Sequence, residues 1–231
     1  MIEIKNLKKN FGKIAALTNV NIKTSSGEVV GFIGPNGAGK TTTIRVLLGI
    51  LQATSGEAKI FGLDCWKDAV EIHKNIAYVP GDVSLWPNLT GGEVIDFFIN
   101  LRKKGINKER RDLLIKKFDF DPVKKCNTYS KGNRQKVVLI AAFSCDADLF
   151  ILDEPTSGLD PLMEKVFVDC ILELKEQGKS VLLSSHILSE IEKLCDRVYM
   201  IRKGETKEIA KKDIACAKSL EALFIEHFKD G

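Results

Sequence analysis

The chain has 231 residues, of which 35 are basic and 31 are acidic, so its formal net charge is +4. This length fits one α/β domain with an inserted lobe and is too short for two large independent domains. Because lysine and arginine are scattered rather than gathered in a stripe, the composition gives no sign of a nucleic-acid-binding surface, and we expect no nucleic-acid partner.

The sequence also gives no sign of a leader, a membrane span or a metal cluster. The first residues, MIEIKNLKKN, carry charges where a signal peptide needs an apolar core, and the longest apolar run, VVLIAAF, is far shorter than the roughly 18 residues that suggest a span. The six cysteines form no CxxC pair, and the three histidines have no metal-ligand spacing. We therefore expect a cytoplasmic chain with reduced thiols.

Strand patterns dominate the first part of the chain. Residues 2–9 and 16–24 read as two strands joined through a turn at Gly12. The apolar run Val29–Ile33 predicts a buried strand, and the segment TTTIRVLLGIL that begins at Thr41 has helical periodicity. The glycine-rich segment GPNGAGKT therefore lies between a strand and a helix.

The pattern changes to helices between residues 88 and 145. Thr90 and Glu93 form a capping box ahead of VIDFFINLRKK, the segment KERRDLLIKKFDF reads as a second helix, and Ser130 can cap a third, RQKVVLIAAFSC. No strand pattern interrupts this region. We expect an all-helical lobe inserted into an α/β core.

Strands and helices alternate on both sides of this lobe. Short strand patterns precede it, and the segments that follow read in turn as strand, helix, strand, helix, two strands and an amphipathic helix: ADLFILDEP, PLMEKVFVDCILELKEQG, SVLLSS, ILSEIEKLC, DRVYMIRKG, ETKEIA and SLEALFIEHFK. This alternation predicts a largely parallel, doubly wound sheet.

The segment GPNGAGKT fits the phosphate-binding pattern G-x-x-x-x-G-K-[ST]. In this pattern, backbone N–H groups of the loop and the helix N-terminus surround phosphate oxygens. We expect Lys40 to reach the β- and γ-phosphates and Thr41 to place its hydroxyl on Mg²⁺. The alternative is a glycine-rich turn with an incidental lysine, which the position between strand and helix disfavours. The candidate nucleotide-binding residues here are Gly34, Pro35, Asn36, Gly37, Ala38, Gly39, Lys40, Thr41 and Thr42.

The segment LFILDEP supplies the expected second half of this site. Its apolar run sets Asp153 and Glu154 at the carboxyl end of a buried strand, where open α/β sheets bind ligands. Asp153 suits Mg²⁺, which prefers carboxylate and water oxygens. Glu154 suits a base that orients and polarises an attacking water.

These motifs, in this order, resemble the nucleotide-binding subunit of an ATP-binding cassette (ABC) transporter over essentially the whole chain. GPNGAGKT resembles the phosphate loop of the family, YSKGNRQKV the start of its signature helix, and LFILDEP its Mg²⁺-and-glutamate strand. SGLD, which ends at Asp160, resembles the interdomain loop, and SSHIL contains the switch histidine, His186. The resemblance implies ATP and Mg²⁺ as cofactors, and a catalytic pair of Glu154 and His186.

The resemblance further implies a head-to-tail pair of cassettes, identical or different. Ser130 and Gly132 then contact ATP held by the second chain, and Asp160 belongs to the same nucleotide-binding surface. Ser130 also suits the N-cap of its own helix. Phe11 stands where the family places an aromatic residue that stacks on adenine, with simple core filling as the alternative.

Two stretches depart from the pattern of the family. The signature usually has a second glycine and a glutamine where this chain has Lys131 and Asn133. The loop after the strand NIAYVP usually carries a glutamine that senses Mg²⁺ and the γ-phosphate, and here Gly81 and Asp82 follow. Asp82 either substitutes for that glutamine through a water or is an ordinary turn residue.

The expected fold is α/β: a P-loop NTPase core with an inserted all-helical subdomain and an antiparallel β-subdomain near the N-terminus. We expect one ABC ATP-binding domain over residues 1–231, with the core in 1–87 and 146–212, the helical subdomain in 88–145 and a C-terminal helix in 213–231.

The resemblance implies ATP hydrolysis that powers a separate multi-span membrane permease, with the chain held on the cytoplasmic face of the membrane. The GD-type loop and the SKGN signature favour an exporter. The alternatives are a soluble ABC ATPase acting on nucleic acid or ribosomes, and a nucleotide-dependent switch without turnover. The segment SLWPNLT, which includes Trp86, either receives a cytoplasmic helix of the permease or packs into the helical lobe.

Overall fold

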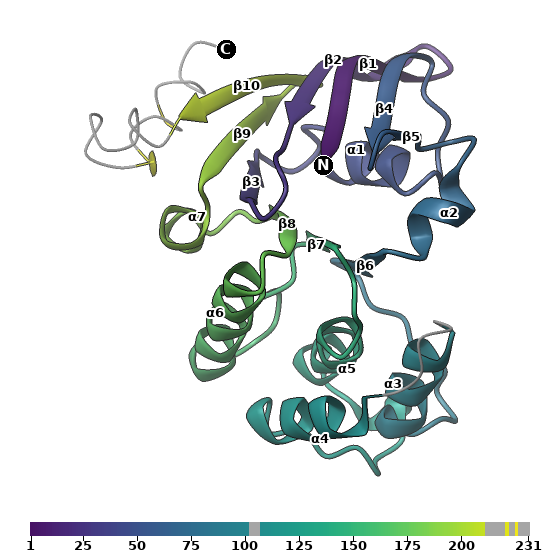
Figure 1. Cartoon of the computed structure of the whole chain (residues 1–231), viewed down its shortest axis with the longest axis vertical. Helices are drawn as coiled ribbons and strands as arrows, with labels where there is room; N and C mark the ends of the chain where they lie inside the picture. The colour runs from purple at the N-terminus through teal and green to yellow at the C-terminus, as the bar shows by residue number, and fades with distance from the viewer. Residues whose placement is uncertain (102–106, 211–219, 222–224, 226–231) are drawn as a thin grey trace.

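The computed structural model describes residues 1–101, 107–210, 220, 221 and 225 (Figure 1). The strands are β1 (Ile2–Phe11), β2 (Ile14–Lys23), β3 (Val29–Ile33), β4 (Ser55–Ile60), β5 (Leu63–Asp64), β6 (Ile76–Val79), β7 (Leu149–Asp153), β8 (Ser180–Ser184), β9 (Arg197–Arg202) and β10 (Glu205–Ala210). The helices are α1 (Lys40–Leu47), α2 (Ala69–His73), α3 (Gly91–Asn100), α4 (Lys108–Lys117), α5 (Lys131–Phe143), α6 (Pro161–Glu176) and α7 (Leu188–Leu194), with a 3-10 turn at Cys126–Thr128. The C-terminal helix expected over 213–231 falls almost entirely outside the described residues.

The described strands form one sheet with a parallel half and an antiparallel half. Their order is β5-β4-β1-β2-β10-β9-β3-β8-β7-β6. Strands β9, β3, β8, β7 and β6 run parallel, and β5, β4, β1 and β2 run antiparallel. The two halves meet at β10, which pairs antiparallel with β9 and parallel with β2, where Glu205 lies beside Asn19. The expected α/β class with an antiparallel N-terminal part is confirmed.

Both faces of the parallel half are covered, which explains its continuous apolar strands. Alternate residues of β3 point to opposite faces, so Val29 and Ile33 join one apolar cluster while Val30 and Phe32 join another. One face packs against α1 and the antiparallel strands, and the other packs against α5, α6 and α7. The carboxyl ends of β3, β7 and β8 are thereby fixed from two sides.

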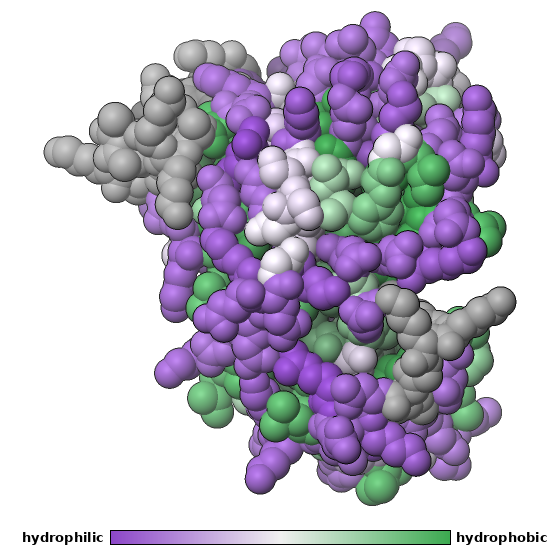
Figure 2. All heavy atoms as spheres, viewed as in Figure 1, coloured by the Kyte–Doolittle hydropathy of each residue, from purple (hydrophilic) through white to green (hydrophobic). Residues whose placement is uncertain are grey.

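The described residues between 88 and 145 form helices, joined by an isolated β-bridge between Thr90 and Lys125. The predicted capping box is confirmed, because the side chains and backbones of Thr90 and Glu93 bond reciprocally at the start of α3. Helices α3, α4 and α5 lie together below the core in Figure 1. In Figure 2 a notch on the right separates this helical lobe from the part of the core that carries α2.

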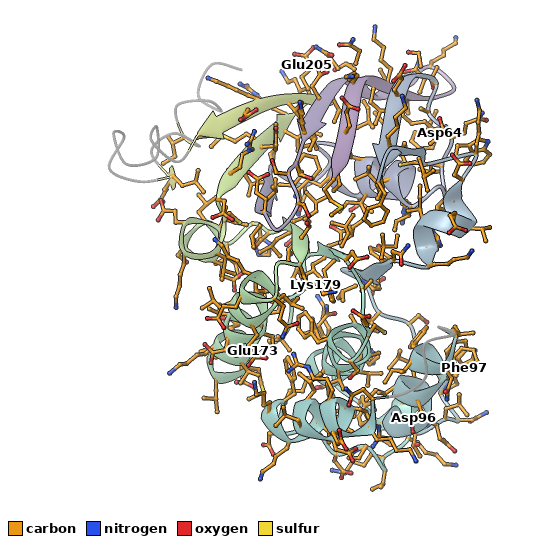
Figure 3. The ribbon with its side chains drawn as sticks, in the orientation of Figure 1. Asp64, Asp96, Phe97, Glu173, Lys179 and Glu205 are labelled. Atoms are coloured by element: carbon orange, nitrogen blue, oxygen red, sulfur yellow. The ribbon has the colours of Figure 1, made fainter. Side chains whose placement is uncertain are left out.

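Charged side chains tie the lobe to the core. Glu173 on α6 accepts from Arg110 of α4 at 3.1 Å and also pairs with Lys117 of α4. Figure 3 shows Glu173 on α6, while Asp96 and Phe97 project from α3 at the lower right of the lobe. Apolar contacts supplement this link, since α5 packs against β6 as well as against α3 and α4. The lobe therefore contacts the core through both charged and apolar groups of the described residues.

Two short elements, β5 and α2, lie where the sequence pattern predicted neither strand nor helix. They have 2 and 5 residues, too few for a periodic pattern to show. The structure contains no disulfide among the cysteines of the described ranges. Within those same ranges, no helix has the length and apolarity needed to cross a membrane.

Candidate functional site

The glycine-rich loop lies between β3 and α1, as its position in the sequence predicts. Gly39 has a φ of 116°, a left-handed conformation that suits glycine, and caps α1 without a side-chain hydrogen bond. The first backbone N–H groups of α1 are thus left for a ligand, and a helix N-terminus favours an anion. This loop forms one wall of a cavity of about 860 Å³.

Lys40, the first residue of α1, is 7% exposed and turns back over the loop. Its Nζ donates to the carbonyl oxygen of Gly34 at 2.6 Å and lies 3.4 Å from Oε1 of Glu154. A buried cation held mainly by neutral carbonyl groups attracts anions strongly. The loop, the helix terminus and this lysine therefore fit the phosphates of a nucleotide.

Asp153 ends β7 and connects the strand ends to α1. Its side chain is 3% exposed, and its two oxygens accept from Thr41 Oγ1 at 3.1 Å and from Ser184 Oγ at 2.6 Å. Hydroxyl and carboxylate oxygens are hard ligands of the kind that Mg²⁺ prefers, and Thr41 and Asp153 line the same cavity as the phosphate loop. The donor set thus fits a Mg²⁺ ion beside the phosphates.

Glu154 has a φ of 48°, in the left-handed region that non-glycine residues seldom adopt. Such a conformation costs about 1–3 kcal/mol and is found mainly at functional sites. The backbone N–H of Glu154 donates to the carbonyl oxygen of Ser184 at 3.0 Å, which fixes this turn. Its side chain faces the cavity, where Oε2 contacts Nδ1 of His186.

The remaining walls of the cavity come from other elements. Tyr78 of β6 lines it, and burial, together with the charge of Asp153, raises the pKa of this phenol to about 12. Gly81 and Asp82 also line it, and a Cβ on Gly81 would lie 3.0 Å from the carbonyl oxygen of Asp153. The loop after β6 therefore reaches the carboxylates, but its closest residue has no side chain.

The structure does not bring all predicted residues to this cavity. Phe11 is 47% exposed, with Lys9 Nζ 5.1 Å from its ring centroid, and does not line the cavity. Core filling is therefore wrong for Phe11, and its adenine-stacking role stays a prediction.

Ser130 caps α5, accepting from the N–H of Asn133 at 3.3 Å, and Asp160 caps α6. Neither Ser130 nor Asp160 lies on the cavity wall.

The start of α5 packs against the loop after β7. A Cβ on Gly132 would lie 2.4 Å from the carbonyl oxygen of Gly158, so glycine is required for this approach. The Nζ of Lys131 donates to Ser157 Oγ at 2.6 Å, and Ser157 lines the nucleotide cavity. The signature segment is therefore connected to the cavity within one chain, although Ser130 and Gly132 lie outside it.

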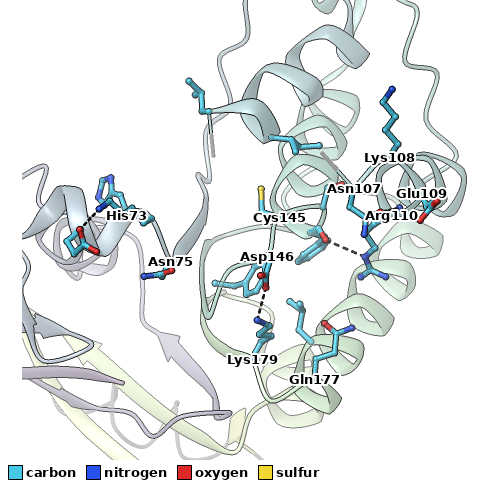
Figure 4. Close-up of a pocket in the computed structure, with 18 of the residues that line it drawn as sticks. His73, Asn75, Asn107, Lys108, Glu109, Arg110, Cys145, Asp146, Gln177 and Lys179 are labelled. Atoms are coloured by element: carbon cyan, nitrogen blue, oxygen red, sulfur yellow. Dashed lines mark hydrogen bonds and ion pairs between the residues drawn. The ribbon is translucent and has the colours of Figure 1, made fainter. Parts of the chain in front are cut away.

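A larger cavity, of about 1500 Å³, opens between α2 and the lobe and contains none of the predicted site residues (Figure 4). Its charged groups bond to protein atoms: Lys179 pairs with Asp146, Arg110 donates to the carbonyl oxygen of Phe143, and His73 contacts the carbonyl oxygen of Leu48. This pairing leaves no convergent set of catalytic groups, so the smaller cavity is the candidate site.

Several residues of the site, among them Ser184, Tyr78 and Ser157, have no role assigned from the sequence. Ser184 stands immediately before the SHIL residues and orients Asp153, so its position in the motif was a usable signal. Tyr78 lies one strand away from Asp153, and only the pairing of β6 with β7 brings it to the cavity. Ser157 belonged to a quoted motif but had no assigned role there.

Comparison with known proteins identifies the family. A family model described as ABC transporter matches residues 17–157. The chain belongs to this family. An ABC transporter ATP-binding protein of Methanocaldococcus jannaschii, MJ1023, is 36% identical over 239 residues, which cover 100% of this chain and 84% of that protein. The bacitracin transport ATP-binding protein BcrA of Bacillus licheniformis is 38% identical over 210 residues, covering 90% of this chain and 69% of that protein.

A solved structure extends the comparison to the assembly. The dimeric post-hydrolysis state of the ATP-binding cassette MJ0796, bound to ADP and Pi, has a TM-score of 0.82 at 26% identity and covers 91% of this chain and 99% of that chain. This ABC cassette therefore has the P-loop NTPase fold, binds ATP and has ATPase activity.

Proposed function

We propose that this ABC cassette hydrolyses MgATP to drive a separate, multi-span membrane permease, and that the transporter is an exporter. The observation that carries the proposal is the convergence of Lys40, Thr41, Asp153, Glu154 and His186 on one cavity, at the ends of β3, β7 and β8. A permease partner would place the chain on the cytoplasmic face of the membrane.

Lys40 and the N–H groups at the start of α1 bind the phosphates, and Thr41 and Asp153 hold Mg²⁺. When bound, Mg²⁺ neutralises charge on the phosphate oxygens. Ser184 donates to one oxygen of Asp153 at 2.6 Å and Thr41 donates to the other at 3.1 Å, so both hydroxyls hold the carboxylate that would bind the ion. The whole phosphate loop, from Gly34 to Thr42, serves as the cradle.

Glu154 acts as the base that takes a proton from the attacking water. Its contact with Nδ1 of His186 orients the carboxylate and places the imidazole beside the reacting phosphate. Lys40, 3.4 Å from Oε1, holds the carboxylate toward the cavity. A switch without turnover is disfavoured, because both members of this pair are present and in contact.

The second half of each site comes from the partner cassette, in a head-to-tail dimer of identical or different chains. Ser130 and Gly132 lie outside the cavity of their own chain, at a helix N-terminus with no acidic residue in its first turn. That surface suits the γ-phosphate held by another chain. The dimeric state of the cassette MJ0796 supports this arrangement.

Export as the direction draws support from the GD-type loop, the SKGN signature and the similarity to BcrA, which is named for bacitracin transport. We also propose the domain division expected from the sequence: a core in 1–87 and 146–212, a helical subdomain in 88–145 and a C-terminal helix in 213–231, within one domain of residues 1–231.

The test is purification of the tagged chain from its own host, with the membrane and soluble fractions separated before detergent extraction. We expect ATPase activity to co-purify from the membrane fraction with a protein that has several membrane spans. Recovery of the active chain on ribosomes or nucleic acid would instead support the soluble-ATPase alternative. A Lys40→Ala variant, recovered with the same partner but without ATPase activity, controls for contaminating enzymes.

A further inference from the structure

A buried carboxyl group lies directly behind the catalytic pair. Glu190 of α7 is 8% exposed, and its Oε2 accepts from Thr156 Oγ1 at 3.3 Å and from Ser185 Oγ at 3.4 Å. Its other oxygen, Oε1, is one of two buried side-chain atoms that lack a hydrogen-bond partner among the described residues. A buried polar group that is only half satisfied is costly, so its retention calls for a reason.

Packing alone does not supply that reason. The neighbours of Glu190 on the same face of α7, Ile191 and Leu194, are 0% and 1% exposed and already anchor the helix to the core. An apolar residue at position 190 would extend this face without a desolvation cost. Burial, together with the charge of Glu164, raises the pKa of the Glu190 carboxyl, although the two hydroxyls and His186 oppose that rise.

The two hydroxyl partners belong to the loops that carry the catalytic residues. Thr156 follows Glu154 by two positions, after β7, and Ser185 immediately precedes His186, after β8. Ser185 Oγ also accepts from the backbone N–H of Ile187 at 3.0 Å, so it braces both sides of His186. One carboxyl oxygen of Glu190 therefore holds the loop of the base and the loop of the histidine together.

We propose that Glu190 is a positioning residue of the ATPase reaction: it fixes the two loops so that Glu154 and His186 stay in contact. Glu190 touches neither the cavity nor the residues assigned to Mg²⁺. The inference rests on the proposed roles of Glu154 and His186. Loss of Glu190 should therefore slow turnover and leave ATP binding intact.

The decisive variants are Glu190→Ala and Glu190→Gln, assayed for kcat, KM for ATP and melting temperature. Glu190→Ala should lower kcat about tenfold, because a small misplacement of reacting groups slows catalysis, and should leave KM within about twofold. Glu190→Gln should restore most of kcat, since its amide oxygen accepts from both hydroxyls. Equal damage by the two variants, or an unchanged kcat in Glu190→Ala, would overturn the proposal.

A second background separates positioning from general destabilisation. In a His186→Ala chain, Glu190→Ala should reduce the residual rate no further, whereas an equal reduction in both backgrounds contradicts the proposal. Thr156→Val keeps the packing but removes one donor, and should reproduce part of the kcat loss even where Glu190→Ala folds poorly. Glu192→Ala, two residues along α7, is the matched control and should keep kcat.

The same experiment distinguishes this inference from the proposed function. If His186→Ala alone hydrolyses ATP at the wild-type rate, then His186 has no catalytic role and the proposed function of the pair fails. If His186→Ala is slow while Glu190→Ala is fast, the pair stands and only the positioning role of Glu190 is lost.

Discussion

The nucleotide cavity and the start of α5 differ in how their residues are partnered. In the cavity, Lys40 donates to the phosphate loop and pairs with Glu154, and Asp153 accepts from Thr41 of α1. Lys40 and Asp153 are buried. At the start of α5, the hydroxyl of Ser130 accepts from its own helix, at 3.3 Å. The residues of the nucleotide cavity bond to one another within one chain, whereas the start of α5 presents its helix N-terminus at the surface. This difference agrees with the proposed head-to-tail arrangement, in which the nucleotide of one chain also contacts the start of α5 of the other.

Charge reinforces the contrast. The first turn of α5 contains Lys131 and Arg134 but no acidic residue, although a helix N-terminus already carries roughly half a positive charge. Like charges at such a terminus are unfavourable unless an anion is near. The start of α5 is thus suited to a polyphosphate that it does not itself hold.

The largest effect should follow from a substitution in the nucleotide cavity. Glu154→Gln should lower kcat by about 10²-fold or more, because the amide keeps the shape of the side chain but cannot accept a proton. ATP affinity, measured by nucleotide binding to the isolated chain, should remain near the wild-type value. The variant should also accumulate as an ATP-bound dimer by size-exclusion chromatography. Near wild-type turnover would remove Glu154 from the role of base.

A substitution at the start of α5 should prevent dimerisation without changing ATP binding. Ser130→Arg adds bulk and charge at the start of α5, so we expect nucleotide-driven dimerisation to be lost while ATP affinity of the dilute monomer is unchanged. Ser130→Ala is the matched control: it removes the N-cap, at a cost of about 1 kcal/mol in stability, without adding bulk. Loss of ATP affinity in the Ser130→Arg monomer would contradict the head-to-tail arrangement.

Trp86 tests a third surface, on the lobe. Its side chain is 48% exposed, and its ring contacts Phe97 edge to face at 5.3 Å and Phe98 at 5.9 Å, so Trp86 packs on the surface of α3 rather than inside the lobe. Leu89, which precedes the Thr90 cap, packs against the apolar cluster instead.

Trp86→Ala should cost only about 0.5–1.5 kcal/mol of stability, from the lost ring contacts, while weakening membrane association. Thermal unfolding and membrane sedimentation measure the two effects. A melting temperature that drops as far as for a buried aromatic would exclude a docking role.

The smallest expected effect concerns the hydrogen bond between Lys131, at the start of α5, and Ser157, which lines the nucleotide cavity. Lys131→Met removes a positive charge and the bond to Ser157, and should weaken ATP-driven dimerisation about three- to fivefold, consistent with a net hydrogen-bond contribution near 1 kcal/mol. The dimer Kd is best measured in the Glu154→Gln background. Ser157→Ala, which loses the bond but keeps the charge, separates the two causes. Tighter dimerisation by Lys131→Met would show that the lysine opposes association.

The sequence predicts the residues of the nucleotide cavity well, because they belong to short motifs with fixed spacing. The strand run Val29–Ile33 and the run LFILD are apolar throughout, so buried strands followed by polar site residues could be recognised without the fold. The helical lobe was equally visible through its caps at Thr90 and Ser130. Local sequence dictates these features.

Other features depend on contacts between distant segments. The antiparallel and parallel halves meet where β10 lies beside β2, through contacts such as the backbone hydrogen bond from Asn19 to Gly204, which no local pattern marks. Glu190 lay within an amphipathic segment, at a spacing that shares a face with Ile191 and Leu194, and an acid on an apolar face was an available signal. The sequence pattern does not predict that Thr156 and Ser185, 34 and 5 residues away, are the hydrogen-bond partners of Glu190.

Glu173 pairs with two cations of α4, so the strength of this link between lobe and core depends on pH and on salt. Burial alone would raise the pKa of Glu173, but the hydrogen bonds and charges of Lys117 and Arg110 outweigh it and hold the pKa below its ordinary value. The link is therefore strongest above that ordinary pKa and weakens as the pH falls through the lowered one. Added salt screens the same charges. Acid and ionic strength should then both weaken the attachment of α4 to α6, while the apolar contact of α5 with β6 remains.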